Sequence, residues 1–201
     1  NYAETFVCAH AARVLGRPVK WMAERTEGML TDNAGRGLVT TATMAFNAEH
    51  KIVAYQLDTI ANMGAYNSGF AQNIQTELFS KVLMGTYDVQ AAHMRTRGVY
   101  TNTTPVDAYR GAGRPEAMFV LERTMDEAAR QLGVDPWELR LKNFIKPDQF
   151  PYTTATNVTY DVGNFPNVLH RAALDCDRAG FAARKAASAE AGKLRGMGLC
   201  Y

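Results

Sequence analysis

The sequence predicts an α+β domain, an antiparallel hairpin and further strands with packed helices, and three observations carry this prediction. Helical and strand-like segments follow one another without the strand–helix–strand rhythm of a doubly wound sheet, and no segment repeats at a fixed period. Residues 37–60 have the pattern of a hairpin, and residues 115–145 have that of two successive helices. With 201 residues, of which 47% are hydrophobic, the chain is long enough to bury a core.

The first elements are a helix and a short strand. The apolar positions of residues 2–15 suit a largely buried helix. Gly16 is expected to end this helix, and Pro18 prevents it from continuing. Val19–Met22 then has the composition of a short strand.

The next segments form the predicted sheet. Residues 37–46 and 52–60 are expected to pair as an antiparallel hairpin through the polar connection 47–51. The Gly- and Asn-rich stretch 62–69 is expected to be a loop, residues 72–84 favour a helix, and residues 87–100 favour a strand.

A glycine-rich turn precedes the strongest helix signal. Residues 109–114 contain Gly111 and Gly113 and lead directly into Pro115 and Glu116, which are typical of a helix N-terminus. Apolar residues at steps of three and four then continue to Leu132, and Gly133 ends the helix. On the polar face we expect two i, i+4 ion pairs, Arg123 with Glu127 and Asp126 with Arg130.

The remaining elements follow from capping residues and composition. Asp135 as N-cap and Pro136 at the first helical position begin a second helix that runs to about Ile145. Residues 146–164 are loop-like, residues 165–191 are mainly helical, and residues 198–201 resemble a strand.

Charge, cysteine and histidine content exclude several classes of protein. A formal charge of +2 without a basic block implies neither nucleic acid nor an anionic membrane as a partner. The longest apolar runs are far shorter than the ~20 residues of a membrane span. Three isolated cysteines indicate a reducing compartment, the cytoplasm, with export to the periplasm left open. Since the cysteines and the four histidines are dispersed, we expect no metal held directly by this chain.

The turn before Pro115 is the candidate binding site. Gly111 and Gly113 allow a ligand to approach the backbone closely, and the first amides of the following helix point outward. Arg110 and Arg114 flank the turn, so an anion is favoured, such as a phosphate, a pyrophosphate or an oxo group on a metal. The spacing matches neither a P-loop nor a dinucleotide-binding turn, and a plain loop-to-helix connection with surface arginines is the alternative.

No catalytic motif accompanies this turn. The serines and cysteines lack the setting of an activated nucleophile. Asp107 and Glu116 flank the turn as candidate acids or bases. Glu116 can equally be a first-turn charge whose interaction with the helix dipole stabilises the helix.

Four stretches of the chain have a distinctive sequence: AYRGAGRPEA at 108–117, LGVDP at 132–136, ELRLKN at 138–143, and LGRPVKW with ERTE at 15–27. These segments resemble the molybdenum hydroxylase family, whose large subunits include those of xanthine dehydrogenase, aldehyde oxidoreductase and aerobic carbon monoxide dehydrogenase. The order of these segments agrees with the family along essentially the whole chain.

This resemblance implies a cofactor for the turn. Arg110, Gly111, Ala112, Gly113 and Arg114 would lie beside the molybdenum of molybdopterin cytosine dinucleotide, with backbone amides near its oxo ligand. In carbon monoxide dehydrogenases a cysteine that binds copper occupies the place of Gly111, so carbon monoxide oxidation is not expected. A phenylalanine that stacks on purines in xanthine dehydrogenases is replaced by Ala112.

The resemblance also implies what the chain is part of. We expect residues 1–201 to be an internal segment of the molybdopterin-binding region, with residues 1–50 ending its first half and residues 51–201 starting its second. The parent enzyme would oxidise an aldehyde or an N-heterocycle with water as the oxygen source, together with an iron–sulfur subunit and an FAD subunit. The base, a glutamate, would lie beyond Tyr201, so this chain would carry no catalytic residue and be inactive alone. A non-catalytic assembly domain of the same fold is the alternative.

Overall fold

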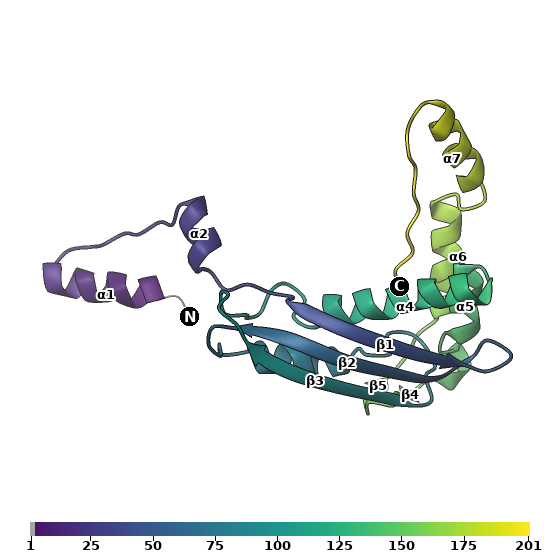
Figure 1. Cartoon of the computed structure of the whole chain (residues 1–201), viewed down its shortest axis with the longest axis horizontal. Helices are drawn as coiled ribbons and strands as arrows, with labels where there is room; N and C mark the ends of the chain where they lie inside the picture. The colour runs from purple at the N-terminus through teal and green to yellow at the C-terminus, as the bar shows by residue number, and fades with distance from the viewer. Residues whose placement is uncertain (1–2) are drawn as a thin grey trace.

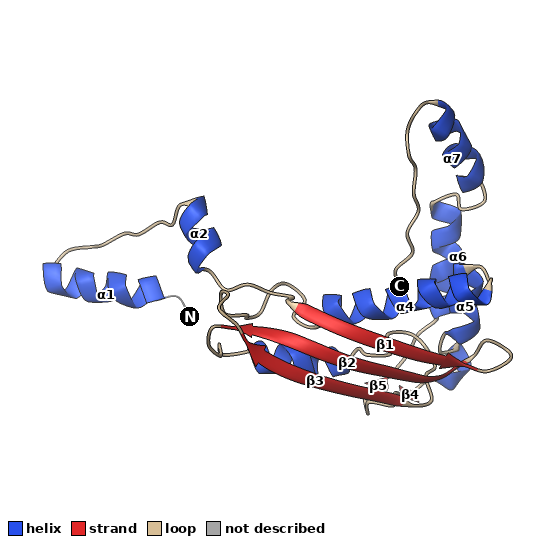
Figure 2. Ribbon diagram, in the orientation of Figure 1, coloured by secondary structure: helices blue, strands red, loops and turns tan. Residues whose placement is uncertain are grey.

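The computed structural model describes residues 3–201, which form a body built on one sheet and an arm at the N-terminal end (Figures 1 and 2). The helices are α1 (Ala3–Leu15), α2 (Arg25–Thr31), α3 (Ala71–Asn73), the π-helix η1 (Ile74–Leu78), α4 (Arg114–Leu132), α5 (Pro136–Asn143), the 3₁₀-helix η2 (Pro147–Gln149), α6 (Phe165–Asp175) and α7 (Phe181–Glu190). The strands are β1 (Leu38–Phe46), β2 (Ile52–Gly64), β3 (Ala92–Tyr100), β4 (Tyr152–Thr153) and β5 (Thr159–Tyr160). Helices and strands therefore mix as an α+β fold, as predicted.

The main sheet has the strand order β1–β2–β3. β1 and β2 pair antiparallel, with Leu38 opposite Ala61 and Phe46 opposite Ile52, which confirms the predicted hairpin. β2 and β3 pair in parallel, with Tyr55 opposite Ala92. A parallel pair needs a crossover connection, and α3 with η1 lies within it.

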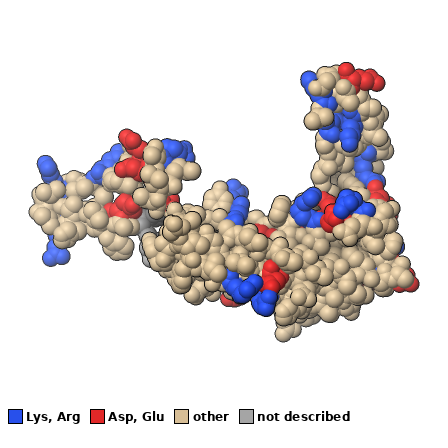
Figure 3. All heavy atoms as spheres, viewed as in Figure 1, with Lys and Arg blue, Asp and Glu red and all other residues tan. Residues whose placement is uncertain are grey.

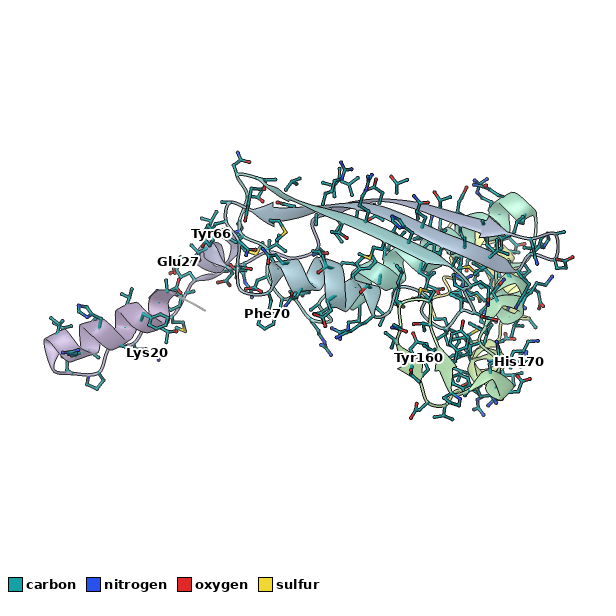
Figure 4. All side chains as sticks on the ribbon, turned by 90° about the horizontal axis from the view of Figure 1, so that it is seen from below. Lys20, Glu27, Tyr66, Phe70, Tyr160 and His170 are labelled. Carbon is teal, nitrogen blue, oxygen red and sulfur yellow. The ribbon has the colours of Figure 1, made fainter. Side chains whose placement is uncertain are left out.

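Helices cover one face of this sheet, and the core lies between the two layers (Figures 1 and 4). Tyr55 and Leu57 of β2 are buried against Phe79, Leu121 and other apolar side chains of the helical layer. The opposite face carries the exposed side chains Val39, Val53 and Ile60. This division fits a sheet whose strands alternate between a covered and an open face.

Helices α4 and α5 begin within one residue of the positions that the sequence predicts. α4 has Pro115 in its first turn and ends at Gly133, which is left-handed at φ +67°. Asp135 caps α5, since its Oδ1 accepts from the amides of Trp137 at 2.8 Å and Glu138 at 3.2 Å. α5 was predicted to end at about Ile145, and it ends at Asn143.

The two arginines of the predicted α4 ion pairs bind other carboxylates than those predicted. Arg123 pairs with Asp126 at 3.6 Å, and Arg130 pairs with Glu127. Both pairs are therefore i, i+3. The partners differ because Asp126 also binds Arg140 of α5, which draws its carboxylate away from Arg130.

Asn143 joins the last turn of α5 to the hairpin. Its side-chain oxygen accepts from the amide of Ile52 at 2.8 Å, and its Nδ2 donates to the carbonyl of His50 at 2.9 Å. Asn143 is buried, so these bonds satisfy hairpin backbone groups that water does not reach.

The N-terminal arm differs from the prediction. α1 forms as expected, but none of its residues is buried, and Phe6 and Val14 are 70% and 68% exposed. Val19–Met22 is not a strand. The arm extends away from the body in Figures 1 and 2, and the apolar side chains of Phe6, Val7, Val14 and Leu15 are exposed.

Other boundaries also move. β2 continues through 62–64 of the expected loop, the expected helix 72–84 is helical only to residue 80, and the expected strand 87–100 begins at Ala92. Residues 146–164 contain η2, β4 and β5, and the expected helix 165–191 is broken into α6 and α7. Residues 198–201 are not a strand.

Charged groups of both signs are interspersed on the face that Figure 3 displays. Among residues 3–201 no helix combines the length and hydropathy that crossing a membrane requires. In the same residues no three side chains of His, Cys, Asp or Glu gather as metal ligands.

Candidate functional site

The five predicted site residues, 110–114, form one tight turn at the start of α4. Gly111, Ala112 and Gly113 are successive left-handed residues, at φ +93°, +34° and +89°. The turn closes on itself, since the amide of Ala112 donates to Tyr109 O at 2.7 Å and that of Arg114 to Gly111 O at 3.2 Å. Glycine at 111 is required twice, by this backbone conformation and because a Cβ would lie 2.7 Å from the Pro115 ring.

The same hydrogen bonds leave other amides free. Within the described residues the amides of Arg110, Gly111 and Gly113 have no hydrogen-bond acceptor. Successive amides in left-handed turn conformations form a concave donor site for an anion. Arg110 and Gly111 are exposed and Gly113 is buried, so the amides of Arg110 and Gly111 are the open donors of the turn.

Two guanidinium groups add positive charge to these donors. Arg110 and Arg114 are exposed, and Arg114 Nη1 donates to Ala112 O at 3.3 Å. This bond keeps the Arg114 side chain folded over the turn. Free amides beside two permanent cations favour an oxyanion.

The turn rests on the helix of the crossover connection. A Cβ on Gly113 would lie 2.6 Å from Ile74 O and 2.9 Å from Phe79 N, so η1 lies directly against the turn. Gln75 of η1 is 2% exposed, and its carboxamide has no hydrogen-bond partner within residues 3–201. A single-turn π-helix with a buried unpaired amide is a costly local structure, of the kind found beside functional sites.

A second segment, residues 33–36, runs along the other side of the turn. Ala34 donates to Pro105 O at 2.9 Å and accepts from the amide of Asp107 at 3.0 Å. Arg36 then donates through Nη2 to Arg110 O and lies 4.6 Å from the centre of the Tyr109 ring. Arg36 is not among the predicted site residues, and its position between Gly35 and Gly37 is the signal that marks it.

The two flanking carboxylates have different surroundings. Glu116 is 7% exposed, its Oε1 lies 3.8 Å from Arg36 Nε, and its Oε2 has no hydrogen-bond partner among the described residues. Asp107 is partly buried, accepting from the amide of Ala108 at 2.7 Å and from Asn33 at 3.2 Å. Asp107 therefore organises the approach to the turn, whereas Glu116 is buried beneath it.

Comparison with known proteins identifies relatives. The family model of the molybdopterin cofactor-binding domain matches residues 1–144. The chain is 36% identical over 170 residues to the carbon monoxide dehydrogenase large chain of Afipia carboxidovorans, covering 83% of this chain and 21% of that protein. It is 30% identical over 201 residues to the nicotine 6-hydroxylase large subunit of Paenarthrobacter nicotinovorans, covering 98% of this chain and 24% of that subunit.

The fold of this chain is similar to part of a solved structure. Quinoline 2-oxidoreductase from Pseudomonas putida 86 superimposes with a TM-score of 0.86 at 29% identity, covering 94% of this chain and 24% of that one. The chain thus spans between a fifth and a quarter of the length of these relatives. The family match over residues 1–144 and the agreement in structure show that this chain belongs to the molybdopterin cofactor-binding domain family.

Proposed function

We propose that this chain forms part of the cofactor pocket in the large subunit of a molybdenum-dependent hydroxylase or dehydrogenase. The observation that carries the proposal is the set of free amides at Arg110, Gly111 and Gly113, between the guanidinium groups of Arg110 and Arg114. These donors suit the oxygens of an oxo or phosphate group.

The residues present fit a molybdopterin cofactor. The turn supplies hydrogen-bond donors and positive charge, and residues 3–201 supply no cluster of metal ligands, which suits a metal that arrives with its own ligands. Residues 110–114 would hold the cofactor, in the cytosine dinucleotide form. When bound, the cofactor supplies the two-electron oxidation of a substrate carbon with oxygen from water.

The chain's own residues contribute binding and orientation. The amides of Arg110 and Gly111 would donate to oxygens of the bound group, and the two arginines would balance its negative charge. Donors fixed before the reaction stabilise developing negative charge without reorganising. The chain carries no base in this proposal; that glutamate belongs to another part of the polypeptide, so the isolated chain is inactive.

The proposed substrate is an N-heterocycle or an aldehyde. Two relatives are named for nicotine and quinoline, both N-heterocycles, and a third for carbon monoxide. Carbon monoxide is not proposed here, because Gly111 provides no thiolate for copper and the cysteines lie at positions 8, 176 and 200.

The proposed assembly contains an iron–sulfur subunit and an FAD subunit in the cytoplasm. Two of the relatives are themselves a large chain and a large subunit, which supports a multisubunit enzyme. Within the large subunit, residues 1–50 would end the first half of the molybdopterin-binding region and residues 51–201 would begin the second.

The test uses the intact protein that contains this chain. Molybdenum and cytidine nucleotide are measured in the purified enzyme, and N-heterocycles and aldehydes are assayed in ¹⁸O-labelled water. We expect both cofactor components and a labelled product, and we expect Arg114→Met to lose cofactor while Arg171→Met, on exposed α6, keeps it. A native enzyme without metal and pterin would contradict the proposal and favour a non-catalytic assembly domain.

A further inference from the structure

Arg36 occupies a backbone conformation that an arginine rarely adopts. Its φ is +63°, in the left-handed region, which costs about 1–2 kcal/mol for a residue with a side chain. Packing holds this conformation from both sides, because a Cβ on Gly35 would lie 3.0 Å from Tyr109 Cβ and one on Gly37 would lie 3.0 Å from Asn62 Cβ. A strained residue fixed by its neighbours suggests that its side chain has a specific task.

Three contacts hold the guanidinium of Arg36. Nη2 donates to Arg110 O, Nε lies 3.8 Å from Glu116 Oε1, and the planar group covers the Tyr109 ring at 4.6 Å. Each contact uses a different part of the group. A lysine ammonium is a point charge without a planar face and does not reproduce this arrangement.

The bond to the Arg110 carbonyl determines where an amide points. In a trans peptide the C=O of residue 110 and the N–H of residue 111 lie in one plane and point in opposite directions. A donor on Arg110 O therefore fixes the direction of the free Gly111 N–H and, being charged, polarises it. Arg114 acts in the same way on the next free amide, since it donates to Ala112 O and the peptide 112–113 carries the Gly113 N–H.

Glu116 completes the arrangement from below. Its side chain is 5% exposed, and Arg36 is the cation that faces it. A buried carboxylate without this partner would be strongly destabilised. Glu116 thus orients Arg36, and Arg36 orients the turn.

We infer that Arg36, held by Glu116, is a positioning residue that aims the Gly111 amide at the oxyanion bound by the turn. The inference rests on the proposed function and adds a residue from outside the glycine-rich segment to its machinery. Arg36 touches the backbone of the turn and acts through it.

The test compares Arg36→Gly and Arg36→Lys in the intact holoenzyme. Glycine favours φ +63°, so Arg36→Gly relieves backbone strain when it removes the guanidinium, and this gain offsets part of the cost of leaving Glu116 without its cation. We expect molybdenum content within about twofold of the wild type and kcat per molybdenum lowered about 10- to 100-fold in both variants, with KM little changed. The electron paramagnetic resonance spectrum of the reduced enzyme should change, and added guanidinium ion should restore part of kcat in Arg36→Gly.

The matched control is Arg171→Met, which removes an exposed arginine from α6 and should leave every readout unchanged. An unchanged kcat per molybdenum in Arg36→Gly would overturn the positioning role. Loss of cofactor from both Arg36 variants in proportion to activity would also overturn it, because Arg36 would then only hold the segment together. A wild-type enzyme without molybdenum contradicts the proposed function itself and is recognised before any variant is made.

Discussion

The guanidinium of Arg140, on α5, lies 2.8 Å from the carboxylate of Glu122, on α4, and both side chains are buried. Tyr87 donates to the other oxygen of Glu122 at 2.7 Å, and Asp126 accepts from Arg140 at 2.9 Å. Arg140 therefore joins α5 to α4 through a buried bond to Glu122 and a partly exposed one to Asp126, and Glu122 in turn accepts from the segment before β3 through Tyr87.

Arg140→Met should destabilise the α4–α5 unit by about 3–5 kcal/mol, because Glu122 would stay buried without its cation. Hydrogen exchange of the α4 and α5 amides in the intact protein measures this loss. Arg171→Met removes an exposed i, i+4 pair and should cost less than about 1 kcal/mol. Equal effects of the two substitutions would contradict the importance of the buried network.

Two glycines in left-handed conformations should respond differently to alanine. Gly133→Ala meets no atom within 4 Å and should cost about 1 kcal/mol from its backbone conformation alone. In Gly113→Ala the new Cβ would lie 2.6 Å from Ile74 O, so the turn must move away from η1 and cofactor binding should be lost. Cofactor content in the two purified variants is the measurement, and retention of cofactor by Gly113→Ala would show that the turn tolerates displacement.

Two substitutions separate the two roles of Asp135, which caps α5 and forms an ion pair with Arg178. Asp135→Ala removes the cap of α5 and should cost about 1 kcal/mol. Asp135→Asn keeps an acceptor for the Trp137 amide and removes only the charge that pairs with Arg178 at 2.6 Å. Hydrogen exchange in the first turn of α5 should therefore accelerate in the alanine variant and stay near wild type in the asparagine variant; the reverse order would assign stability to the ion pair.

Stability should fall at alkaline pH. Burial raises the pKa of Tyr201 from 10.0 to about 12, and burial also raises the pKa of Tyr55 and Tyr87. The folded state therefore favours neutral phenols, so this stabilisation is complete below pH 10 and is lost as the unfolded chain gives up protons above it. Denaturant midpoints measured across this range should decrease, and less steeply in Tyr201→Phe; a slope unchanged by that substitution would remove Tyr201 as a contributor.

The hairpin and the pair α4–α5 could be predicted because their signals are local. Gly133 and Asp135 act within one turn of the helices that they end and begin. The exposure of α1 could not be predicted in this way. Its apolar side chains indicate burial, but packing depends on a partner surface that is absent from residues 3–201.

The candidate site was predicted in part. The turn at 110–114 was visible from its glycines and arginines, whereas the free amides at Gly111 and Gly113 depend on hydrogen bonds that composition does not reveal. Arg36 was missed because it precedes Arg110 by 74 residues, and only the pairing of Ala34 with Val106 brings the two segments together. The contact of η1 with Gly113 likewise depends on the parallel crossover between β2 and β3.

The hydrogen bond from the Ile52 amide to Asn143 can form only after α5 has been synthesised. The two residues are 91 positions apart, and at about 5–20 residues per second the partner leaves the ribosome roughly 5–18 seconds after the hairpin. During that interval the Ile52 amide has no partner, and the apolar face of the hairpin is covered only as η1 and α4 follow. Chaperone contact with the emerging polypeptide should therefore be strongest between the appearance of β2 and that of α5, and should end when Asn143 docks.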